Sequence, residues 1–414
     1  MTLHKPTTIP ISDHGFETPL RETDVFHPIR YVSGDFDFQA LKTQAEVKAM
    51  NSAARIVRIH KLPPIHTPLQ ARDIFAKRIL GLLTSSRYRR GSIHYVTSFD
   101  TVFTSSILDA IAHDNPLELI LEFFAFKMRN CLRTFGQDGT EVDLSEASTI
   151  VRLYEIACAI RHLYPPGAIV KVATDGNKFH RALETPLETA RKYSQNLQML
   201  AAMMGVSDTV RILDEADYFD DGYMERTDKW YLQIRNEYFT VKHSDIVVTI
   251  HKLWNSMHYM LPISNEMPIE VVSLAFSRDV SDVTLRRRDL EAYHLRRHIQ
   301  ERALDATFQY VAVKKANPQM LRKIAPHALP CCAHPRPGYL GLYISGRGQT
   351  IFPHHSQGTT KRGSPNPKID DIRLEYAADI RRNPDCTHSL RGLVLPLVKY
   401  PFSHRLHPFT FIET

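Results

Sequence analysis

The chain has 414 residues, 43% hydrophobic and 23% charged, and is long enough to bury the core of one large domain or two ordinary ones. Its formal net charge of +7 favours an anionic ligand such as phosphate, although a basic surface without a partner gives the same balance. The five cysteines form no C-x-x-C pair, which argues against a disulfide framework or a zinc ribbon. Because no apolar run reaches the roughly 18 residues of a membrane span, we expect a cytoplasmic protein with no membrane partner.

Residues 1–64 have mixed polarity and recurring aromatic side chains, so we expect an N-terminal arm packed on the body of the protein. A helix is predicted to begin at Pro68, and a second one spans about 101–112. Between them lie Arg89 and Arg90, whose planar guanidinium groups suit paired hydrogen bonds to phosphate. A solvated basic loop is the alternative for these two arginines.

The central stretch predicts a strand, a helix and a second strand. Residues 117–126 form an apolar run typical of a buried strand. Asp143 is the expected N-cap of the helix, and Glu146, three residues later, completes a capping-box pattern. The sequence Pro-Pro-Gly at 165–167 ends the helix, and residues 168–173 form the second strand.

Polar residues follow both strands at their carboxyl ends, where ligands bind in open α/β sheets. Lys127, Arg129 and Asn130 follow the first strand, and Asp175 and Gly176 follow the second. We expect Lys127 to be a cation for phosphate or carboxylate rather than a Schiff-base amine. The structural alternatives are an exposed lysine at a strand end and an ordinary Asp-Gly turn.

A further helix over about 186–204 and a strand at 210–213 continue the alternation of strands and helices. This order predicts an α/β fold with a Rossmann-like, largely parallel sheet flanked by helices. The absence of G-x-G-x-x-G from the sequence gives no reason to expect a dinucleotide. We expect the core to span 65–280, and 281–414 to form a smaller C-terminal α+β portion that completes the site.

Ten residues of the central stretch resemble, in order, the motifs of the isocyanide (isonitrile) synthase family of the pyoverdine/dityrosine biosynthesis type. They are Lys127, Asn130, Asp143, Glu146, Pro166, Gly167, Ala168, Asp175, Gly176 and Phe179. Near the C-terminus, His334-Pro335 and Pro353 with His355 resemble two further family motifs. Pro330, Cys332 and His354 depart from the family pattern, so the amino-acid substrate and the retention of activity stay open.

The resemblance implies an enzyme that converts the amine of an amino acid to an isonitrile, with ribulose 5-phosphate as carbon donor. It implies metal-free acid–base and imine chemistry, no cofactor, small-molecule partners and no nucleic acid, and it leaves a homo-oligomer open. The expected catalytic residues are Lys127, Glu146, Asp175, His334 and His355, because histidine and carboxyl groups can exchange protons. The expected substrate-binding residues are Arg89, Arg90, Arg129, Asn130, Asp143, Gly176 and Phe179. Asp143 and Glu146 could instead serve only as helix caps.

Two other classes of function are open to the sequence. His243-Ser244-Asp245 with a distant histidine such as His334 would suit a non-haem iron oxygenase, although that motif is short and that enzyme class has a different fold. Arginines at 286–288 and 296–297 lie in a predicted long helix, 284–315, and would suit a nucleic-acid-binding protein without catalysis. Acidic residues alternate with these arginines, so a solvated helix face with local ion pairs is the simpler expectation.

Overall fold

The structure, a computed structural model, describes most of the chain between residues 30 and 413. The described ranges are 30–34, 37–60, 68–90, 100–134, 139–241, 244–264, 267–277, 287–333, 338–345, 351–360, 368–382, 391–394 and 409–413.

The centre of the protein is a five-stranded parallel sheet in the order β4-β3-β2-β5-β6. Its strands are β2 (Leu117–Glu122), β3 (Ala168–Thr174), β4 (Val210–Asp214), β5 (Leu329–Cys332) and β6 (Leu340–Gly341). Parallel strands need crossover connections, and α5 (Leu144–Leu163) and α7 (Leu187–Met203) supply those of β2–β3 and β3–β4. The α/β fold with a Rossmann-like sheet is therefore confirmed.

Alternation of side chains along β2 gives the sheet two buried faces, as expected of a parallel sheet. Leu119 and Leu121 belong to the main core with α5, whereas Ile120 and Ala173 pack with α12 (Met320–Ile324) on the other face. Helix α5 is buried around almost its whole circumference, which is typical of a helix enclosed by other elements.

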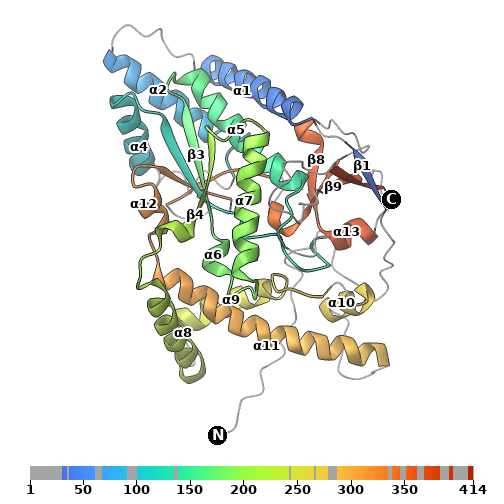
Figure 1. Ribbon diagram of the computed structural model, residues 1–414. Helices are drawn as coiled ribbons and strands as arrows, with labels where there is room; N and C mark the ends of the chain where they lie inside the picture. Colours follow the sequence, from blue (N-terminus) through green and yellow to red (C-terminus); the bar gives the residue numbers. More distant parts are fainter. Residues whose placement is uncertain are drawn as a thin grey trace.

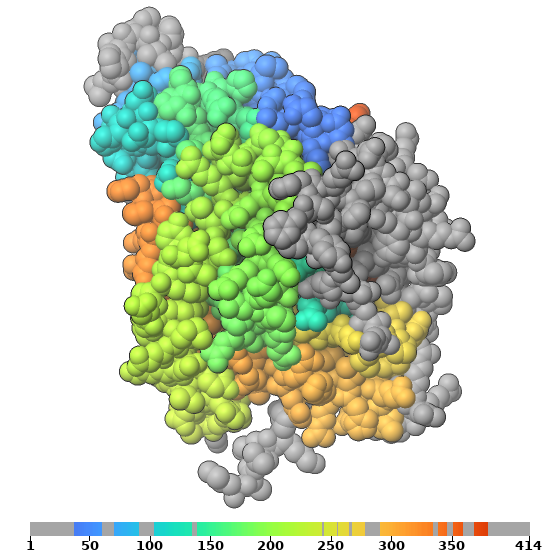
Figure 2. Space-filling view, viewed as in Figure 1, coloured from blue at the N-terminus to red at the C-terminus, as the bar shows by residue number. Residues whose placement is uncertain are grey.

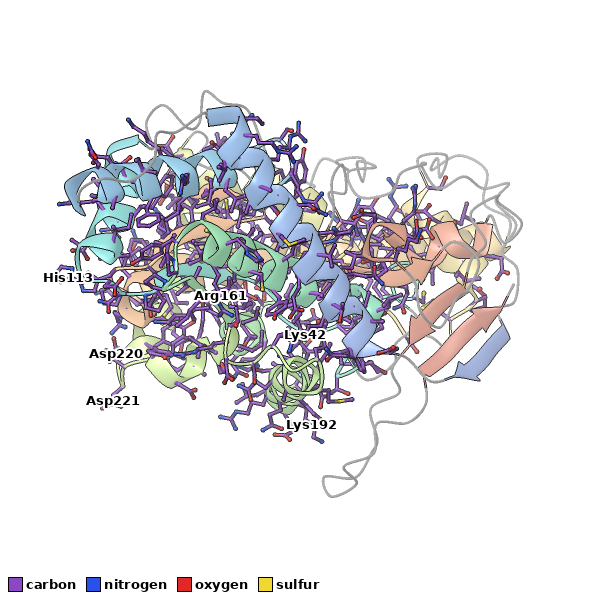
Figure 3. All side chains as sticks on the ribbon, turned by 90° about the horizontal axis from the view of Figure 1, so that it is seen from above. Lys42, His113, Arg161, Lys192, Asp220 and Asp221 are labelled. Carbon is purple, nitrogen blue, oxygen red and sulfur yellow. The ribbon has the colours of Figure 1, made fainter. Side chains whose placement is uncertain are left out.

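Helix α1 (Phe38–His60) lies across α5, as Figure 3 shows from above. Its buried stripe consists largely of alanines, Ala45, Ala49 and Ala53, which allow two helices to approach closely. Lys42 of α1 also donates a hydrogen bond to the carbonyl oxygen of Gly205, just after α7. The sequence analysis did not predict this helix within the arm, because an alanine stripe gives little hydrophobic contrast.

The remaining helices lie at the edges of the sheet and below it in the view of Figure 1. Figure 2 shows the surface of the same face, with residues of α11 (orange) along its lower edge. Helices α2 and α4 pack against each other near α1, and the long α11 runs across the end of the molecule occupied by α8, α9 and α10. Their bounds are α2 Pro68–Leu83, α4 Asp100–Ala112, α6 Gly176–Phe179, α8 Tyr223–Thr240, α9 Asp245–Met257, α10 Ile269–Phe276, α11 Arg287–Ala316 and α13 Ala377–Arg382, with short 3-10 helices η1 Glu215–Tyr218, η2 Pro353–His355 and η4 Ile369–Asp371. None of the described helices is long and apolar enough to cross a membrane.

A second, antiparallel sheet lies beside the first, in the order β1-β10-β9-β7-β8. Its strands are β1 (Arg30–Gly34), β7 (Gln357–Thr360), β8 (Ile372–Glu375), β9 (Arg391–Val394) and β10 (Phe409–Glu413). Strands β7 and β8 contact α5, so this helix joins both sheets. The expected division of the chain into 1–64, 65–280 and 281–414 stays a prediction, although β5 and β6 complete the parallel sheet from beyond residue 280.

Several predicted elements are present, with small differences at their ends. The helices expected at 186–204 and 284–315 correspond to α7 and α11. The strand expected at 117–126 ends at Glu122, because the positive φ of Phe124 (69°) turns the chain out of the sheet.

Replacing Gly176 with alanine is expected to lower the free energy of unfolding by at least about 2 kcal/mol. A Cβ atom at Gly176 would lie 1.8 Å from the carbonyl oxygen of Ala125, and neither backbone can move without displacing β2 or α6. Urea denaturation of the variant measures this loss. The matched control is Gly222→Ala, where the nearest atom, Nη1 of Arg226 at 2.8 Å, is the end of a flexible side chain. Equal stability of the two variants would contradict this account.

Candidate functional site

The site lies where the order of the parallel strands reverses. The chain proceeds outward from β2 to β3 and β4, but later returns to place β5 on the opposite side of β2. In open α/β sheets the crevice outside the carboxyl ends of the strands at such a reversal is the usual ligand site. The topology therefore places this site at the ends of β2, β3 and β5.

A cavity of about 180 Å³ occupies this crevice. It is smaller than the roughly 300–1,000 Å³ typical of pockets for drug-sized ligands, a size that suits a small molecule. We call it the switch-point pocket. Its lining comes from the ends of β2, β3 and β5, from α6 and α11, and from η2, and comprises Glu122, Phe123, Phe124, Ala125, Met128, Asp175, Phe179, Leu183, Met260, Tyr310, Lys314, Cys332, Ala333, Phe352, His354 and His355.

One wall of the switch-point pocket is aromatic. Phe123 and Phe124 leave the end of β2, and Phe352 precedes η2 from the far end of the chain. The Phe123 ring lies 5.3 Å from that of Phe352 and 5.5 Å from that of His354, both in edge-to-face geometry. His355, an expected catalytic residue, is half-buried beside them, with its ring 4.2 Å from that of His354.

Charged groups form another part of the lining, which we call the charged wall. Asp175, at the end of β3, lines the pocket, and Lys178 of α6 is ion-paired with Glu122 and with Glu215 at 3.2 Å. Burial, followed by the neighbouring Glu122, raises the pKa of Asp175 to about 7, against the lowering effect of two lysines. A carboxyl group with this pKa exchanges protons readily at neutral pH.

Helix α11 supplies two pocket residues that the sequence analysis missed, Tyr310 and Lys314. Tyr310 stacks on Phe179, with ring centroids 4.4 Å apart, which accounts for the position of this expected substrate-binding residue. The ammonium group of Lys314 lies 4.7 Å from the centroid of the Tyr310 ring. Burial lowers the pKa of Lys314, but Tyr310 and Glu122 together raise it by more than burial lowers it. The net pKa lies above the ordinary value, so this side chain stays a cation. Tyr310 and Lys314 are four residues apart, so they lie on the same face of α11. This spacing is visible in the sequence, but the many arginines of the helix pointed to a solvated face instead.

Lys127 lies behind the pocket instead of in it. Its side chain is 1% exposed, and its Nζ atom lies 2.9 Å from Glu146 Oε1 and 3.0 Å from Asp143 Oδ2. It also donates to Ser145 Oγ at 3.0 Å and to the carbonyl oxygen of Pro353 at 3.1 Å. These contacts occupy the donors of the ammonium group, which differs from the accessible strand-end lysine expected from the sequence. We call Lys127, Asp143 and Glu146 the buried ion cluster.

The capping role of Asp143 and Glu146 is confirmed. The backbone N–H of Ser145 donates to Asp143 Oδ1 at 2.6 Å, and that of Asp143 donates to Glu146 Oε2 at 2.8 Å, so the capping box is complete. Tyr193 of α7 donates to Glu146 Oε1 at 2.8 Å. Burial raises the pKa of Glu146 to about 8, against the lowering effect of Lys127.

The remaining expected site residues have different surroundings. Asn130 is fully buried and accepts the backbone N–H of Leu132 at 3.0 Å, and neither it nor Arg129 lines the switch-point pocket. Gly176 is the point of closest approach between α6 and Ala125. His334 lies outside the described residues, directly after Ala333 of the pocket wall.

Arg89 and Arg90 lie beside β6, at the β5 side of the pocket. The backbone of Arg90 donates to the carbonyl oxygen of Gly341 at 2.9 Å, and Gly341 is the strand partner of Cys332 in the pocket wall. Arg89 Nε is buried without a hydrogen-bond partner within the ranges described above. Both arginines are half-buried and lie within two strands of the pocket.

The described residues give little support to the two other classes of function. The parallel sheet differs from the β-helix expected of an iron oxygenase, and His243 lies outside the described residues. Among the residues that are described, no three His, Cys, Asp or Glu side chains are grouped to hold a metal ion. On α11, Arg297 pairs with Glu301 at 3.3 Å, and Arg302 pairs with Glu184. These ion pairs match the expected solvated helix face better than a nucleic-acid surface.

Comparisons with known proteins agree on one family and fold. A family model described as pyoverdine/dityrosine biosynthesis protein matches residues 107–329, which ends before η2. Isocyanide synthase A of Aspergillus fumigatus is 24% identical over 131 residues, which make up 31% of this chain and 22% of that protein's length. The crystal structure of the PvcA protein from Pseudomonas aeruginosa is similar with a TM-score of 0.55 and 13% identity, covering 81% of this chain and 99% of that one. At this identity the structural likeness shows the fold alone.

Replacing Lys127 with methionine is expected to lower the free energy of unfolding by about 3–5 kcal/mol, because two buried carboxyl groups lose their cation. Thermal and urea denaturation measure the loss. The control is Lys192→Met on α7, whose ammonium group lies 3.8 Å from Glu188 with both side chains more than half exposed (Figure 3). Such a surface pair contributes about 0–1 kcal/mol. A Lys127 variant as stable as the control would show that the buried ion cluster does not hold the fold together.

Proposed function

The chain belongs to the pyoverdine/dityrosine biosynthesis protein family, and we propose that it is an isocyanide synthase-like enzyme acting on an amino acid and ribulose 5-phosphate. The observation that carries this proposal is a small pocket at the reversal of the parallel sheet, lined by aromatic rings together with a titratable aspartate and a lysine. The name of the related isocyanide synthase supports the reaction type. The cytoplasmic location expected from the sequence stays a prediction.

The first step of the proposed reaction is condensation of the amine with the ketone of the sugar phosphate. A base removes one proton from the ammonium group, the nitrogen bonds to the carbonyl carbon, and the carbonyl oxygen leaves as water, giving an imine. This step needs a proton acceptor and a proton donor held at the same place, and no change of oxidation state. The chemistry is metal-free in this proposal, as the sequence resemblance implies.

We assign the proton acceptor to Asp175, because its raised pKa leaves it both basic and partly ionised at neutral pH. His355 lies in the same pocket and is the proposed proton donor to the leaving water. His334, one residue beyond the pocket wall, stays a proposed catalytic residue on the strength of the resemblance.

The anionic groups of the two substrates need cations. Lys314 at the pocket is placed to bind the carboxylate of the amino acid, which leaves the amine toward Asp175. Arg89 and Arg90 lie beside β6, and we propose that they bind the phosphate. Phe179 lines the pocket, and Gly176 allows α6 to lie against the backbone of Ala125, another lining residue. Asn130 and the carbonyl oxygen of Arg129, which accepts the backbone N–H of Ile263, hold the loop after β2.

The buried ion cluster has a supporting role in this proposal. Lys127 and Glu146 hold η2 and the loop after β2 in place, and Asp143 caps α5, so they act on the pocket through its backbone. This assignment replaces the direct catalytic contact expected of Lys127 and Glu146.

Incubation of the protein with uniformly ¹³C-labelled ribulose 5-phosphate and a mixture of amino acids tests the proposed reaction. We expect one amino acid to gain a single labelled carbon and lose two hydrogens, as mass spectrometry detects. Omission of the sugar phosphate is the control. A protein that forms no such product, and whose melting temperature does not respond to the sugar phosphate, would exclude the proposed function.

The pH dependence of kcat/KM tests the role of Asp175. A base must be deprotonated, so the rising limb of kcat/KM is expected to pass through about pH 7. Because the charge of Lys314 lowers the pKa of Asp175, the variant Lys314→Met should move this rise to higher pH, whereas Lys192→Met should not. Asp175→Asn should lower kcat/KM by about 10²–10⁴-fold. If Lys314→Met leaves the pH profile unchanged, the group that titrates near pH 7 is not Asp175.

A further inference from the structure

His354 is a histidine enclosed by aromatic rings on the wall of the switch-point pocket. Its residue is 7% exposed, yet it lines the cavity. Its ring stacks on that of Phe352 at a centroid distance of 5.5 Å, and meets Phe123 and Phe124 edge to face at 5.5 and 6.3 Å. His354 therefore adds the polar atoms of one imidazole to a wall that is otherwise largely apolar.

The backbone around His354 is fixed on both sides. Its own carbonyl oxygen accepts the backbone N–H of Met128 at 2.8 Å. The preceding carbonyl oxygen, of Pro353, accepts from Lys127 Nζ at 3.1 Å and from Ser145 Oγ at 2.9 Å. With the backbone held to the loop after β2 and to the start of α5, and with rings on three sides, the imidazole cannot swing away from the pocket.

One imidazole nitrogen is left without a partner. Nδ1 of His354 is buried and makes no hydrogen bond within the described parts of the chain. A buried polar atom without a partner costs roughly 1–3 kcal/mol, and such atoms in native proteins call for an explanation. The imidazole of His354 lines the cavity, so a molecule bound there is the group from outside the described residues that this ring can meet.

The charge of the ring limits what that molecule can be. Burial, and then the charge of Lys127 behind it, lower the pKa of His354 to about 3, so the ring is neutral at physiological pH. A neutral imidazole has one N–H donor and one nitrogen acceptor, and does not attract an anion as a cation does. It is also too weak a base to take the proton of an ammonium group. A neutral polar group, such as a hydroxyl or an N–H, is the partner that fits.

We infer that His354 is a specificity-determining residue, which hydrogen-bonds a neutral polar group on the side chain of the amino-acid substrate. In the proposed function Asp175 and Lys314 hold the amine and carboxylate. The substrate side chain is then proposed to lie against Phe123, Phe352 and His354, which line the same pocket. The selected substrate has a largely apolar side chain with one neutral hydrogen-bonding group. This inference rests on the proposed function for the identity of the ligand as an amino acid.

The test compares amino acids that differ only in such a group, namely tyrosine with phenylalanine and threonine with valine. We expect wild-type kcat/KM to favour the polar member of the preferred pair by at least about tenfold, because the apolar member leaves the imidazole unpaired. His354→Phe keeps the ring shape and removes both nitrogens, and should reduce the preference to about twofold or less. His354→Asn or His354→Gln should restore part of it, since an amide again offers a donor and an acceptor.

His113→Phe is the matched control, because His113 lies exposed at the far end of α4 (Figure 3) and should leave the preference unchanged. Melting temperature shows whether His354→Phe is folded, and the same measurement is made with each amino acid added. If no amino acid is converted, the proposed function fails. The role of His354 is still supported if the polar member of a pair raises the melting temperature of the wild type more than the apolar member does, and His354→Phe shows no such difference. Equal responses of the two proteins to both members of each pair, in turnover or in melting temperature, would overturn it.

Discussion

One buried ammonium group, that of Lys127, joins three segments that are distant in the sequence. It contacts both carboxyl groups at the start of α5, and it donates to the carbonyl oxygen of Pro353, 226 residues further along the chain. Removing a lysine and two carboxyl groups from water is costly unless each is paired and hydrogen-bonded, and the capping box and Tyr193 complete that pairing. The loop after β2, the start of α5 and η2 are consequently held in one arrangement.

The switch-point pocket depends on this arrangement. Phe123 and Phe124 come from the segment before Lys127, and Phe352, His354 and His355 come from the segment that Lys127 holds through Pro353. Burial is the main cause of the lowered pKa of His354, and the charge of Lys127 lowers it further. Lys127 therefore holds the backbone of the aromatic wall and also contributes to its neutrality without lining the cavity.

The charged wall also combines lysines with carboxyl groups, but the result differs from that in the buried ion cluster. Lys178 is paired with Glu122 and Glu215, as Lys127 is with its own two carboxyl groups. Asp175, however, lies next to Glu122 at the cavity, and the nearby lysines do not fully offset burial and the negative charge. The buried ion cluster is closed to the pocket and has a structural role. The group around Lys178 instead leaves Asp175 able to exchange a proton with a bound molecule.

The sequence by itself determined the order of strands and helices from β2 to β4, the start of α5 at Asp143 and the α/β fold. Those features depend on hydrophobic periodicity and capping residues, which act over a few neighbouring positions. The family resemblance also predicted Asp175, Phe179 and His355 as site residues, and all three line the switch-point pocket. Only the tertiary structure decided that Lys127 faces Glu146 behind the pocket, that Lys314 and Tyr310 of α11 reach the pocket, and that His354 lacks a partner. These features depend on contacts between segments far apart in the sequence, and neither periodicity nor residue type specifies which buried groups will meet.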